Sequence, residues 1–426
     1  MPRKFFALIL ITIIMLNITL ASCGTNESTD QINYYTLEGS ASLIDSLIYE
    51  YNEYCGEDNK INVTEFSDEK ALSNAISTEI MAGKGPDIIS LSTLSYSSVS
   101  FDKLLQQGTF ADINAIINND SSDNKFNFEN YNENIINACV FEGKLVLMPI
   151  SYLPNVLIST EEKRNSYINN QSLDYKTVVS INEDLTEYSF FEYEDEYESL
   201  FYDYIDDNVD LYNNITSFNT DEFLNTAKGV KSIMINTYDK ESLCTSSDTF
   251  SLLFTCENFM QKINNGETPI LLNNPSNDGE YTADICEAVA VNSNTSEKKQ
   301  QKILEFIKYI LSDTVQNDFC GADTEKLDDS LYSGMYYPVN KAAFDKLFST
   351  AKELLYTENE TKIDYKLVKY IQETINKIDN YQISMTYDYY NNNVINDTVS
   401  KYLNDNLSEE EFVNQLKSKT EIYLEE

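Results

Sequence analysis

Histidine and tryptophan are both absent from this chain of 426 residues. Without histidine, the chain lacks the commonest general base and the commonest metal ligand. Ser-His and Cys-His nucleophile pairs are therefore excluded, as are zinc sites built on histidine. The Gly-x-Ser-x-Gly, His-Glu-x-x-His and phosphate-loop patterns are missing too. The sequence thus predicts a protein that is not an enzyme and that needs no metal or cofactor.

Glycine and proline are scarce, with 12 and 7 residues, and 42% of the chain is hydrophobic. This composition excludes a collagen-like or disordered chain and indicates a folded globular protein. Its length suits two or three domains of about 150 residues each. We find no internal repeat and no long linker.

Positive charge is also scarce, since 30 lysines and arginines face 70 acidic residues, for a net charge of −40. A nucleic-acid partner is disfavoured, because such binding depends on Lys and Arg neutralising phosphates. A heavily solvated surface that resists self-association explains the acidity, and we expect a monomer. A local pocket can still carry any charge.

A long apolar run opens the chain, from Phe5 to about Leu20, after Arg3 and Lys4. It is too short to span a membrane and ends in Leu-Ala-Ser-Cys23, which is typical of a bacterial lipoprotein signal. We expect cleavage after residue 22, lipid such as palmitate on Cys23, and a flexible tether over 23–31. The protein would then be exported and anchored on the outer face of the cytoplasmic membrane. An ordinary secretory signal or an N-terminal anchor is the alternative.

Six further cysteines follow Cys23, and no two of them form a Cys-x-x-Cys pair. They are Cys55, Cys139, Cys244, Cys256, Cys286 and Cys320. An exported protein can form disulfides, but six cysteines allow 15 pairings and the sequence does not choose among them. Their core-like positions favour buried free thiols, with at least one disulfide as the alternative.

Residues 32–91 alternate between strand and helix patterns. Residues 32–37, 60–66 and 86–91 are strand-like, and the stretches between them carry apolar residues at three- and four-residue spacing. This order predicts a parallel sheet covered by helices on both faces. Ligands bind at the carboxyl ends of the strands in such sheets. The polar residues in the three loops there are therefore candidates, with helix capping as the alternative role: Ser40, Asp68, Ser92 and Thr93.

The chain changes character after about residue 144. Lys144–Thr160 is a long apolar stretch that Pro149 and Pro154 should break into two strands, as when a chain leaves one sheet for another. Glu192–Asp210 mixes acids with aromatics; it lacks the ligand pattern of a calcium loop and predicts an amphipathic helix with an acidic outer face. Further helices are expected over 100–142, 219–234 and 297–311 and over most of 345–426.

Four segments together resemble the extracellular solute-binding proteins of ABC importers, the family that includes sugar binders. They are Met81-Ala-Gly-Lys-Gly-Pro-Asp-Ile-Ile, Phe141-Glu-Gly-Lys-Leu-Val-Leu-Met-Pro-Ile-Ser-Tyr152, Glu287-Ala-Val-Ala-Val-Asn-Ser with the helix up to Leu311 and Ser-Asp-Thr-Val-Gln316, and Tyr337-Pro-Val-Asn-Lys341. Their order spans nearly the whole exported part of the chain.

The resemblance implies a two-lobed α/β fold of the periplasmic-binding-protein type II, with a mostly parallel sheet in each lobe and hinge crossovers between them. The expected first lobe comprises 32–148 plus 276–336, and the second 149–275 plus 337–426. Ligand would bind in the cleft, the lobes would close over it, and the closed form would dock on an ABC permease.

A carbohydrate is the first choice of ligand, because tyrosine, with 31 copies, offers both a ring face and a hydroxyl. The tyrosine candidates are Tyr96, Tyr152, Tyr281, Tyr336 and Tyr337, and the hydrogen-bonding candidates beyond the four loop residues are Ser151, Asn277 and Asp278. Peptide, amino-acid or polyamine ligands remain open. A binding-fold lipoprotein that acts as a sensor partner or in surface interactions is the alternative function.

Overall fold

The structure is a computed structural model, which describes residues 30–169, 172–185, 188–191, 194–218, 220–234, 240–246, 262–263, 265–320, 336–354 and 365–425. The predicted signal, the lipidation site at Cys23, most of the tether and Cys256 lie outside the described residues. Within them, no helix has the length and apolar character that crossing a membrane requires.

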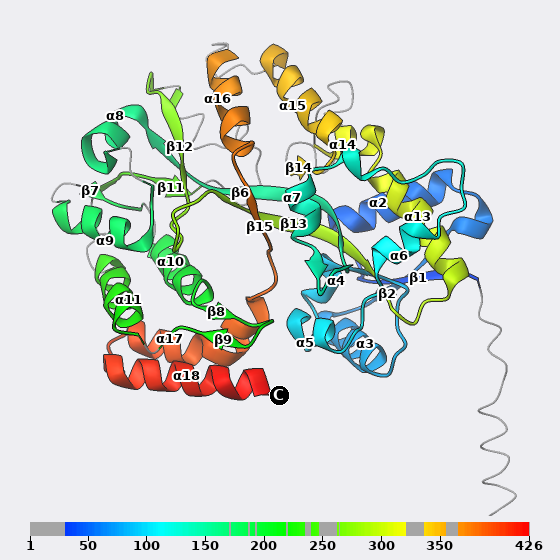
Figure 1. Cartoon of the computed structure of the whole chain (residues 1–426), viewed down its shortest axis with the longest axis horizontal. Helices are drawn as coiled ribbons and strands as arrows, with labels where there is room; N and C mark the ends of the chain where they lie inside the picture. The colour runs from blue at the N-terminus through cyan, green and yellow to red at the C-terminus, as the bar shows by residue number, and fades with distance from the viewer. Residues whose placement is uncertain are drawn as a thin grey trace, which may run out of the picture.

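Three parallel strands begin the fold, as predicted. β1 (Ile32–Leu37) pairs in parallel with β2 (Ile61–Phe66) on one side and with β3 (Ile88–Ser90) on the other. Helix α2 (Leu43–Tyr54) and helix α13 (Glu297–Ile310) lie on one side of these strands, and α3 (Glu69–Met81) lies on the other (Figure 1). The apolar stripe of each helix is buried against the sheet, including Leu72, Ile76 and Ile80 of α3.

Two long antiparallel strands join this sheet to the rest of the molecule. β6 (Met148–Thr160) and β13 (Thr282–Val291) pair with each other, and β13 also pairs with β3. Beyond β13, β6 pairs with β11 (Thr245–Ser246) and β12 (Pro269–Asn273). β14 (Tyr337–Pro338) adds to β6, and β15 (Asn380–Ile383) runs parallel to β13.

The predicted break of β6 at its prolines is wrong, because one strand runs through both. Proline lacks the N–H of a ladder hydrogen bond, so strands tolerate it mainly at irregular positions. Pro149 lies opposite Ala288, where the register of β13 shifts. The expected passage from one set of strands to another does occur along β6.

The remaining elements are short strands and helices. Between β3 and β6 lie α4 (Leu91–Leu94), α5 (Phe101–Gln106), α6 (Ile113–Asn118), α7 (Glu133–Asn137), β4 (Val140–Phe141) and β5 (Lys144–Leu145). Between β6 and β12 lie α8 (Glu161–Lys163), α9 (Tyr175–Asp184), β7 (Tyr188–Ser189), α10 (Glu194–Asp206), β8 (Val209–Asp210), β9 (Ile215–Thr216), α11 (Asp221–Met234), β10 (Glu241–Ser242) and β11. After α13 come α14 (Asp313–Phe319), β14, α15 (Lys341–Leu354), α16 (Tyr365–Ile375), β15, the π-helix η4 (Tyr390–Ile395), α17 (Asn396–Leu403) and α18 (Glu409–Glu425).

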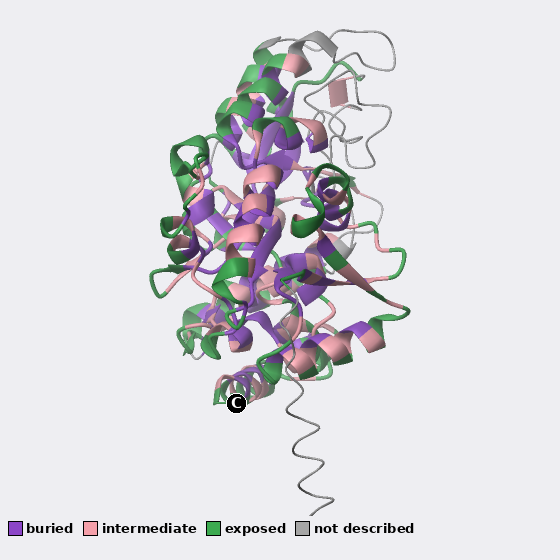
Figure 2. Cartoon of the chain, turned by 90° about the vertical axis from the view of Figure 1, so that its right-hand side faces the viewer, coloured by how far each residue is buried: buried purple, intermediate pink, exposed green. Residues whose placement is uncertain are grey.

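Two hydrophobic cores divide the molecule. The first core is formed by β1–β3, β6, β13, α13 and their covering helices, and the second by α9, α10, α11, α17 and α18. The buried strands and inner helix faces are enclosed by exposed outer faces (Figure 2). The sequence assigned all of 337–426 to the second lobe, whereas the buried residues of α15 and α16 belong to the first core. The exact lobe boundaries stay a proposal.

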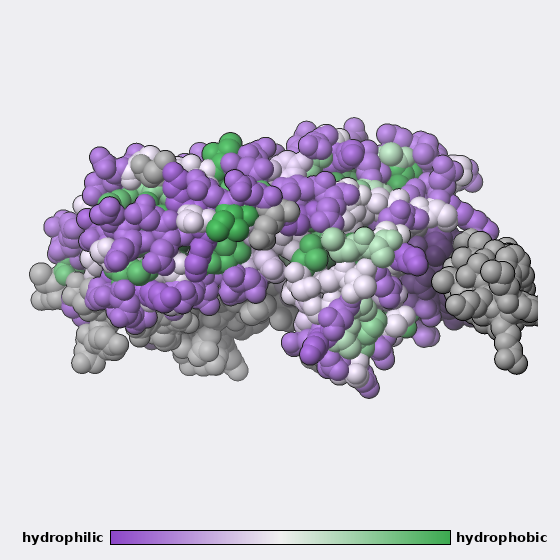
Figure 3. Space-filling view, turned by 90° about the horizontal axis from the view of Figure 1, so that it is seen from below, coloured by the Kyte–Doolittle hydropathy of each residue, from purple (hydrophilic) through white to green (hydrophobic). Residues whose placement is uncertain are grey.

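Most of the described surface seen from below is hydrophilic (Figure 3). This agrees with the acidic composition and the solvated surface that it predicts. The five cysteines that the structure describes are free thiols, with Cys139, Cys244 and Cys320 buried. Buried free thiols were the favoured expectation, and Cys55 and Cys286 differ from it in being only partly buried.

Candidate functional site

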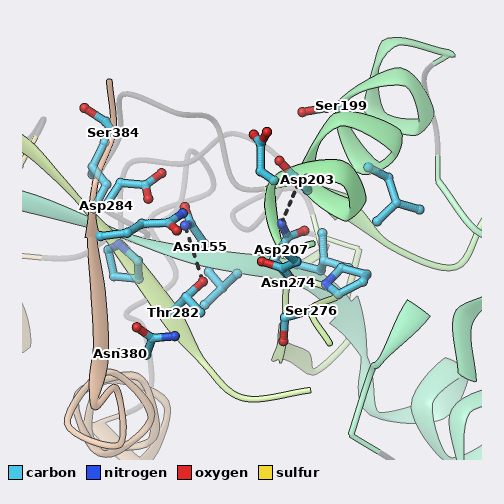
Figure 4. Close-up of a pocket in the computed structure, with 18 of the residues that line it drawn as sticks. Asn155, Ser199, Asp203, Asp207, Asn274, Ser276, Thr282, Asp284, Asn380 and Ser384 are labelled. Atoms are coloured by element: carbon cyan, nitrogen blue, oxygen red, sulfur yellow. Dashed lines mark hydrogen bonds between the residues drawn. The ribbon is translucent and has the colours of Figure 1, made fainter. Parts of the chain in front are cut away.

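A cavity of about 900 Å³ lies between α10 and the strands that connect the two cores (Figure 4). Strands alternate the direction of their side chains, so every second residue faces the same way. β13 accordingly presents Thr282, Asp284 and Cys286 to the cavity. The β15 segment presents Asn380, Gln382 and Ser384 in the same manner.

Helix α10 forms the opposite wall. Residues three and four apart lie on one helix face, and Glu196, Ser199, Asp203 and Asp206 follow this spacing toward the cavity. The opposite face of α10 carries Phe201, Tyr204 and Ile205, which are buried in the second core. The expected helix is confirmed as α10, but not all of its acidic residues face outward. Its apolar face packs into the second core, and this orientation leaves some of the acidic residues facing the cavity.

Hydrogen bonds fix these carboxylates to the surrounding loops. Asp207 accepts from the Tyr175 hydroxyl at 3.1 Å and from the backbone N–H of Asn277 at 2.9 Å. Asp203 accepts from the Asn274 side-chain amide at 3.3 Å (Figure 4). These bonds tie the loop that follows β12 to α10 and give the cavity a third wall.

Burial raises the pKa of the acids around the cavity, since it disfavours their charged form. Burial, together with the nearby charges of Asp284 and Asp207, raises the pKa of Asp203 to about 7. Burial likewise raises the pKa of Asp206, Asp207 and Asp284 above the ordinary value. The cavity is thus rich in hydrogen-bond acceptors, and part of its acid is protonated near neutral pH.

Aromatic rings complete the larger cavity. Its lining includes Tyr175, Phe191, Tyr336, Tyr337 and Tyr387. Rings beside amides, hydroxyls and carboxylates suit a polar organic ligand that has an apolar face. Among the described residues, no group of histidines, cysteines and acids is arranged to hold a metal ion.

A second cavity of about 390 Å³ lies at the carboxyl edge of β1 and β3. The hydroxyls of Ser40 and Ser42 point back to Asp45, at 2.5 and 2.7 Å. Ser92 and Thr93 are both hydrogen-bonded to the Ser90 hydroxyl, at 2.9 and 2.8 Å. This edge is where the parallel sheet predicted a ligand-binding surface.

Eight of the twelve predicted ligand residues line one of the two cavities. Ser40, Ser92, Thr93 and Tyr96 line the smaller cavity. Asn277, Asp278, Tyr336 and Tyr337 line the larger one.

The structure places the other four elsewhere. Asp68 caps α3 on the surface, accepting from Ala71 N–H at 2.9 Å, which was its alternative role. Ser151 and Tyr152 are buried within the first core, since they lie on β6 between β13 and β14. Tyr281 donates to the Leu271 carbonyl at 3.1 Å and packs against the first core.

Sequence reasoning missed the acids of α10 and the residues of β13 and β15. A signal for Asp203 and Asp206 existed in their helical spacing, but nothing in the sequence showed which face of the helix turns inward. The residues of 380–384 were missed because the sequence predicted mostly helix over 345–426, whereas β15 begins at Asn380.

Solved structures share this fold. A protein of Synechococcus sp. named as an oligosaccharide periplasmic-binding protein matches with a TM-score of 0.61 at 12% identity, over 93% of this chain and 99% of that one. An ABC substrate-binding protein of Listeria monocytogenes in complex with cycloalternan matches with a TM-score of 0.55 at 13% identity, over 92% and 97%. A maltose/maltodextrin-binding domain of Bdellovibrio bacteriovorus bound to maltotriose matches with a TM-score of 0.51 at 12% identity, over 93% and 100%. No protein-family model and no curated protein sequence matches the chain.

The chain therefore has the two-lobed α/β fold of periplasmic solute-binding proteins, and its structural neighbours are of the sugar-binding type. The sequence predicted this fold class.

Proposed function

We propose that this protein is an exported solute-binding protein that captures a carbohydrate and delivers it to an ABC importer. The observation that carries the proposal is the cavity of about 900 Å³ between α10 and the connecting strands, in a fold shared with oligosaccharide-binding proteins. The cavity offers rings for a sugar face and side chains such as Asn155, Thr282 and Asn380 for its hydroxyls. Lobe closure over the solute would give the form that a permease recognises.

We further propose that Cys23 carries lipid and that the mature protein works as a monomer at the outer face of the cytoplasmic membrane, without catalysis of its own. The Leu-Ala-Ser-Cys23 motif supports the anchor. Mass spectrometry of the N-terminal peptide is expected to show a diacylated Cys23. A Cys23→Ser variant should lose the membrane association.

Isothermal titration calorimetry of the mature protein against a panel of oligosaccharides tests the proposal. A binder present at 100 times its Kd is expected to stabilise the fold by about 2.7 kcal/mol. Heat with sugars and a matching rise in melting temperature would support carbohydrate capture. If no sugar gave a measurable heat of binding and peptides did, the proposal of carbohydrate capture would be rejected. Permease and ATPase genes beside this gene would favour import over the sensor or surface-interaction role.

A further inference from the structure

The larger cavity gathers acidic side chains without a basic residue among them. Its lining includes six acids, namely Glu196, Asp203, Asp206, Asp207, Asp278 and Asp284, and no lysine or arginine among the residues that the structure describes. Two buried acids elsewhere in the protein do have such a partner. Asp87 pairs with Lys299 at 2.9 Å, and Asp120 pairs with Lys308 at 2.7 Å.

Two of the cavity acids also have unused hydrogen-bonding capacity. One carboxylate oxygen of Asp284 and one of Asp206 are fully buried and have no hydrogen-bond partner in the described part of the chain. An unpaired buried acceptor costs about 1–3 kcal/mol, and more when it is charged. A ligand that donates hydrogen bonds here removes that cost.

The acids approach the same space from two sides. Asp203 comes from α10 and Asp207 directly follows this helix, while Asp284 comes from β13 and faces them across the cavity (Figure 4). Asp284 and Asp207 disfavour the charged form of Asp203, and a positive group between these carboxylates would offset that repulsion.

We infer that the captured solute carries a protonated amine, as in an amino sugar, and that this amine lies between the carboxylates of α10 and β13. This inference rests on the proposed carbohydrate capture. An ammonium group donates three hydrogen bonds and carries the missing charge, whereas a neutral hydroxyl supplies one donor and no charge. A metal ion fits less well, because the described acids, histidines and cysteines form no group arranged as metal ligands.

The experiment compares oligosaccharides of the same length that differ only in their amines. Calorimetry of the mature protein uses glucosamine oligomers, their N-acetylated counterparts and maltooligosaccharides at pH 7.5. The free amine is expected to improve affinity by at least about tenfold, the scale of one hydrogen bond to a charged group. Raising the salt concentration should weaken the amine ligand most.

Variants locate the effect within the cavity. Asp203→Asn and Asp284→Asn are each expected to remove most of the advantage of the amine. Asp184→Asn is the matched control, because Asp184 is the exposed last residue of α9 and lies outside both cavities. An equal loss in the control variant would show a general charge effect and contradict the inference.

Affinity for the amino sugar should also pass through a maximum between pH 6 and pH 8, because a rising pH first ionises the acids and then removes the proton of the amine. Asp203 interacts with Asp207, directly after α10, and with Asp284 on β13, and it also acts on Asp206 at the end of α10 and on Tyr175. Asp388, after β15, acts on Asp206 and Asp284, and Tyr387 interacts with Asp206 and Asp207. Proton release on binding should appear as a dependence of the measured heat on the buffer. A flat pH profile would contradict the inference.

The outcomes separate the two proposals. If N-acetylated or neutral sugars bind as tightly as the free amines, the inference fails and carbohydrate capture stands. If spermidine binds and no saccharide does, the amine site stands and carbohydrate capture fails. Saturable binding of calcium alone that Asp203→Asn abolishes, or no binding of any amine, overturns the inference.

Discussion

At the residue scale, Asp203 shows how a fold changes the chemistry of a carboxylate. Its ordinary pKa of 3.8 rises to about 7 because the side chain is buried beside Asp284 and Asp207. A folded-state pKa above the unfolded value means that ionisation opposes folding. The stability of the unliganded protein should therefore fall as the pH rises from about 4 to about 7.

Replacing Asp203 by Asn should stabilise the unliganded protein at pH 8, since the variant carries no charge there. The expected gain in the free energy of unfolding is about 2–4 kcal/mol at pH 8, and it should vanish near pH 4. Urea denaturation of both proteins at the two pH values measures it. An equal effect at both pH values would mean that packing, and not charge, separates the two side chains.

Lys299 contrasts with Asp203, because it is a mostly buried charge that has a partner of opposite charge. Its ammonium lies 2.9 Å from Asp87, whose side chain is only 9% exposed. Asp87 also accepts from the backbone N–H of Asn33 at 2.9 Å and from the Thr295 hydroxyl at 3.1 Å. The pair therefore connects α13 to the first strands.

Lys299→Met should cost about 3–5 kcal/mol in the free energy of unfolding, because it leaves Asp87 buried without its counter-charge. The neighbouring Lys298 is a matched control, since its side chain is 65% exposed and pairs with Asp30 on the surface. Lys298→Met should cost less than about 1 kcal/mol. Chemical denaturation of both variants would contradict the argument if the two losses were similar.

At the element scale, the sequence predicted regular patterns well and short or irregular ones poorly. Residues 32–91 follow clear strand and helix periods, and the structure has their three parallel strands and two covering helices. β15 has only four residues, Asn380–Ile383, between helices, and its strand state depends on pairing with β13. Such pairing is a tertiary contact that no local pattern records.

The loop 274–279 is another element whose form depends on its surroundings. Gly279 has a φ of +67°, and a Cβ at this position would collide with the Ser172 side chain. Gly279→Ala should therefore displace the loop, which supplies Asn277 and Asp278 to the cavity, and weaken solute binding. Calorimetry with the cognate solute measures the loss.

Gly266→Ala is a control that distinguishes the effect of backbone strain from that of a steric clash with a neighbouring side chain. Gly266 also has a positive φ, of +79°, but no described residue has an atom within 4 Å of the place that its Cβ would occupy. This control should lose about 1 kcal/mol of stability from backbone strain and keep its affinity. Equal effects on binding from both variants would show that the collision with Ser172 is unimportant.

At the scale of the whole molecule, the candidate site is assembled from segments far apart in the sequence. Asp203, Asp284 and Asn380 belong to three elements and meet only because β13 pairs with β15 and lies opposite α10. The sequence could therefore predict the two-lobed fold and the carboxyl edge of the first sheet. The sequence could not predict that the acids of α10 line the larger cavity, because their position depends on how the two cores are arranged relative to each other.

The two cores also touch away from the connecting strands. Tyr423 of α18 belongs to the second core, and its hydroxyl lies 2.7 Å from both the Ser100 hydroxyl and an Asp102 carboxylate oxygen at the start of α5. Nearby, the rings of Phe141 and Tyr212 meet at 5.5 Å. The Tyr423 contacts bridge α18 and α5, at the base of the molecule in Figure 1, and the ring contact joins β4 to the turn after β8. Both hold the cores together.

Tyr423→Phe should loosen this contact, because it removes a buried hydrogen bond to Asp102, which is only 2% exposed. A loss of about 1–3 kcal/mol in this arrangement of the cores shifts the population toward molecules in which the cores have separated, and lowers the apparent affinity for solute. Small-angle X-ray scattering should show a larger radius of gyration without solute and the wild-type value at saturation. Tyr389→Phe is the control, since the Tyr389 ring stacks on Tyr423 but its hydroxyl has no hydrogen bond among the described residues. Unchanged scattering and affinity in Tyr423→Phe would show that the connecting strands alone set the arrangement of the two cores.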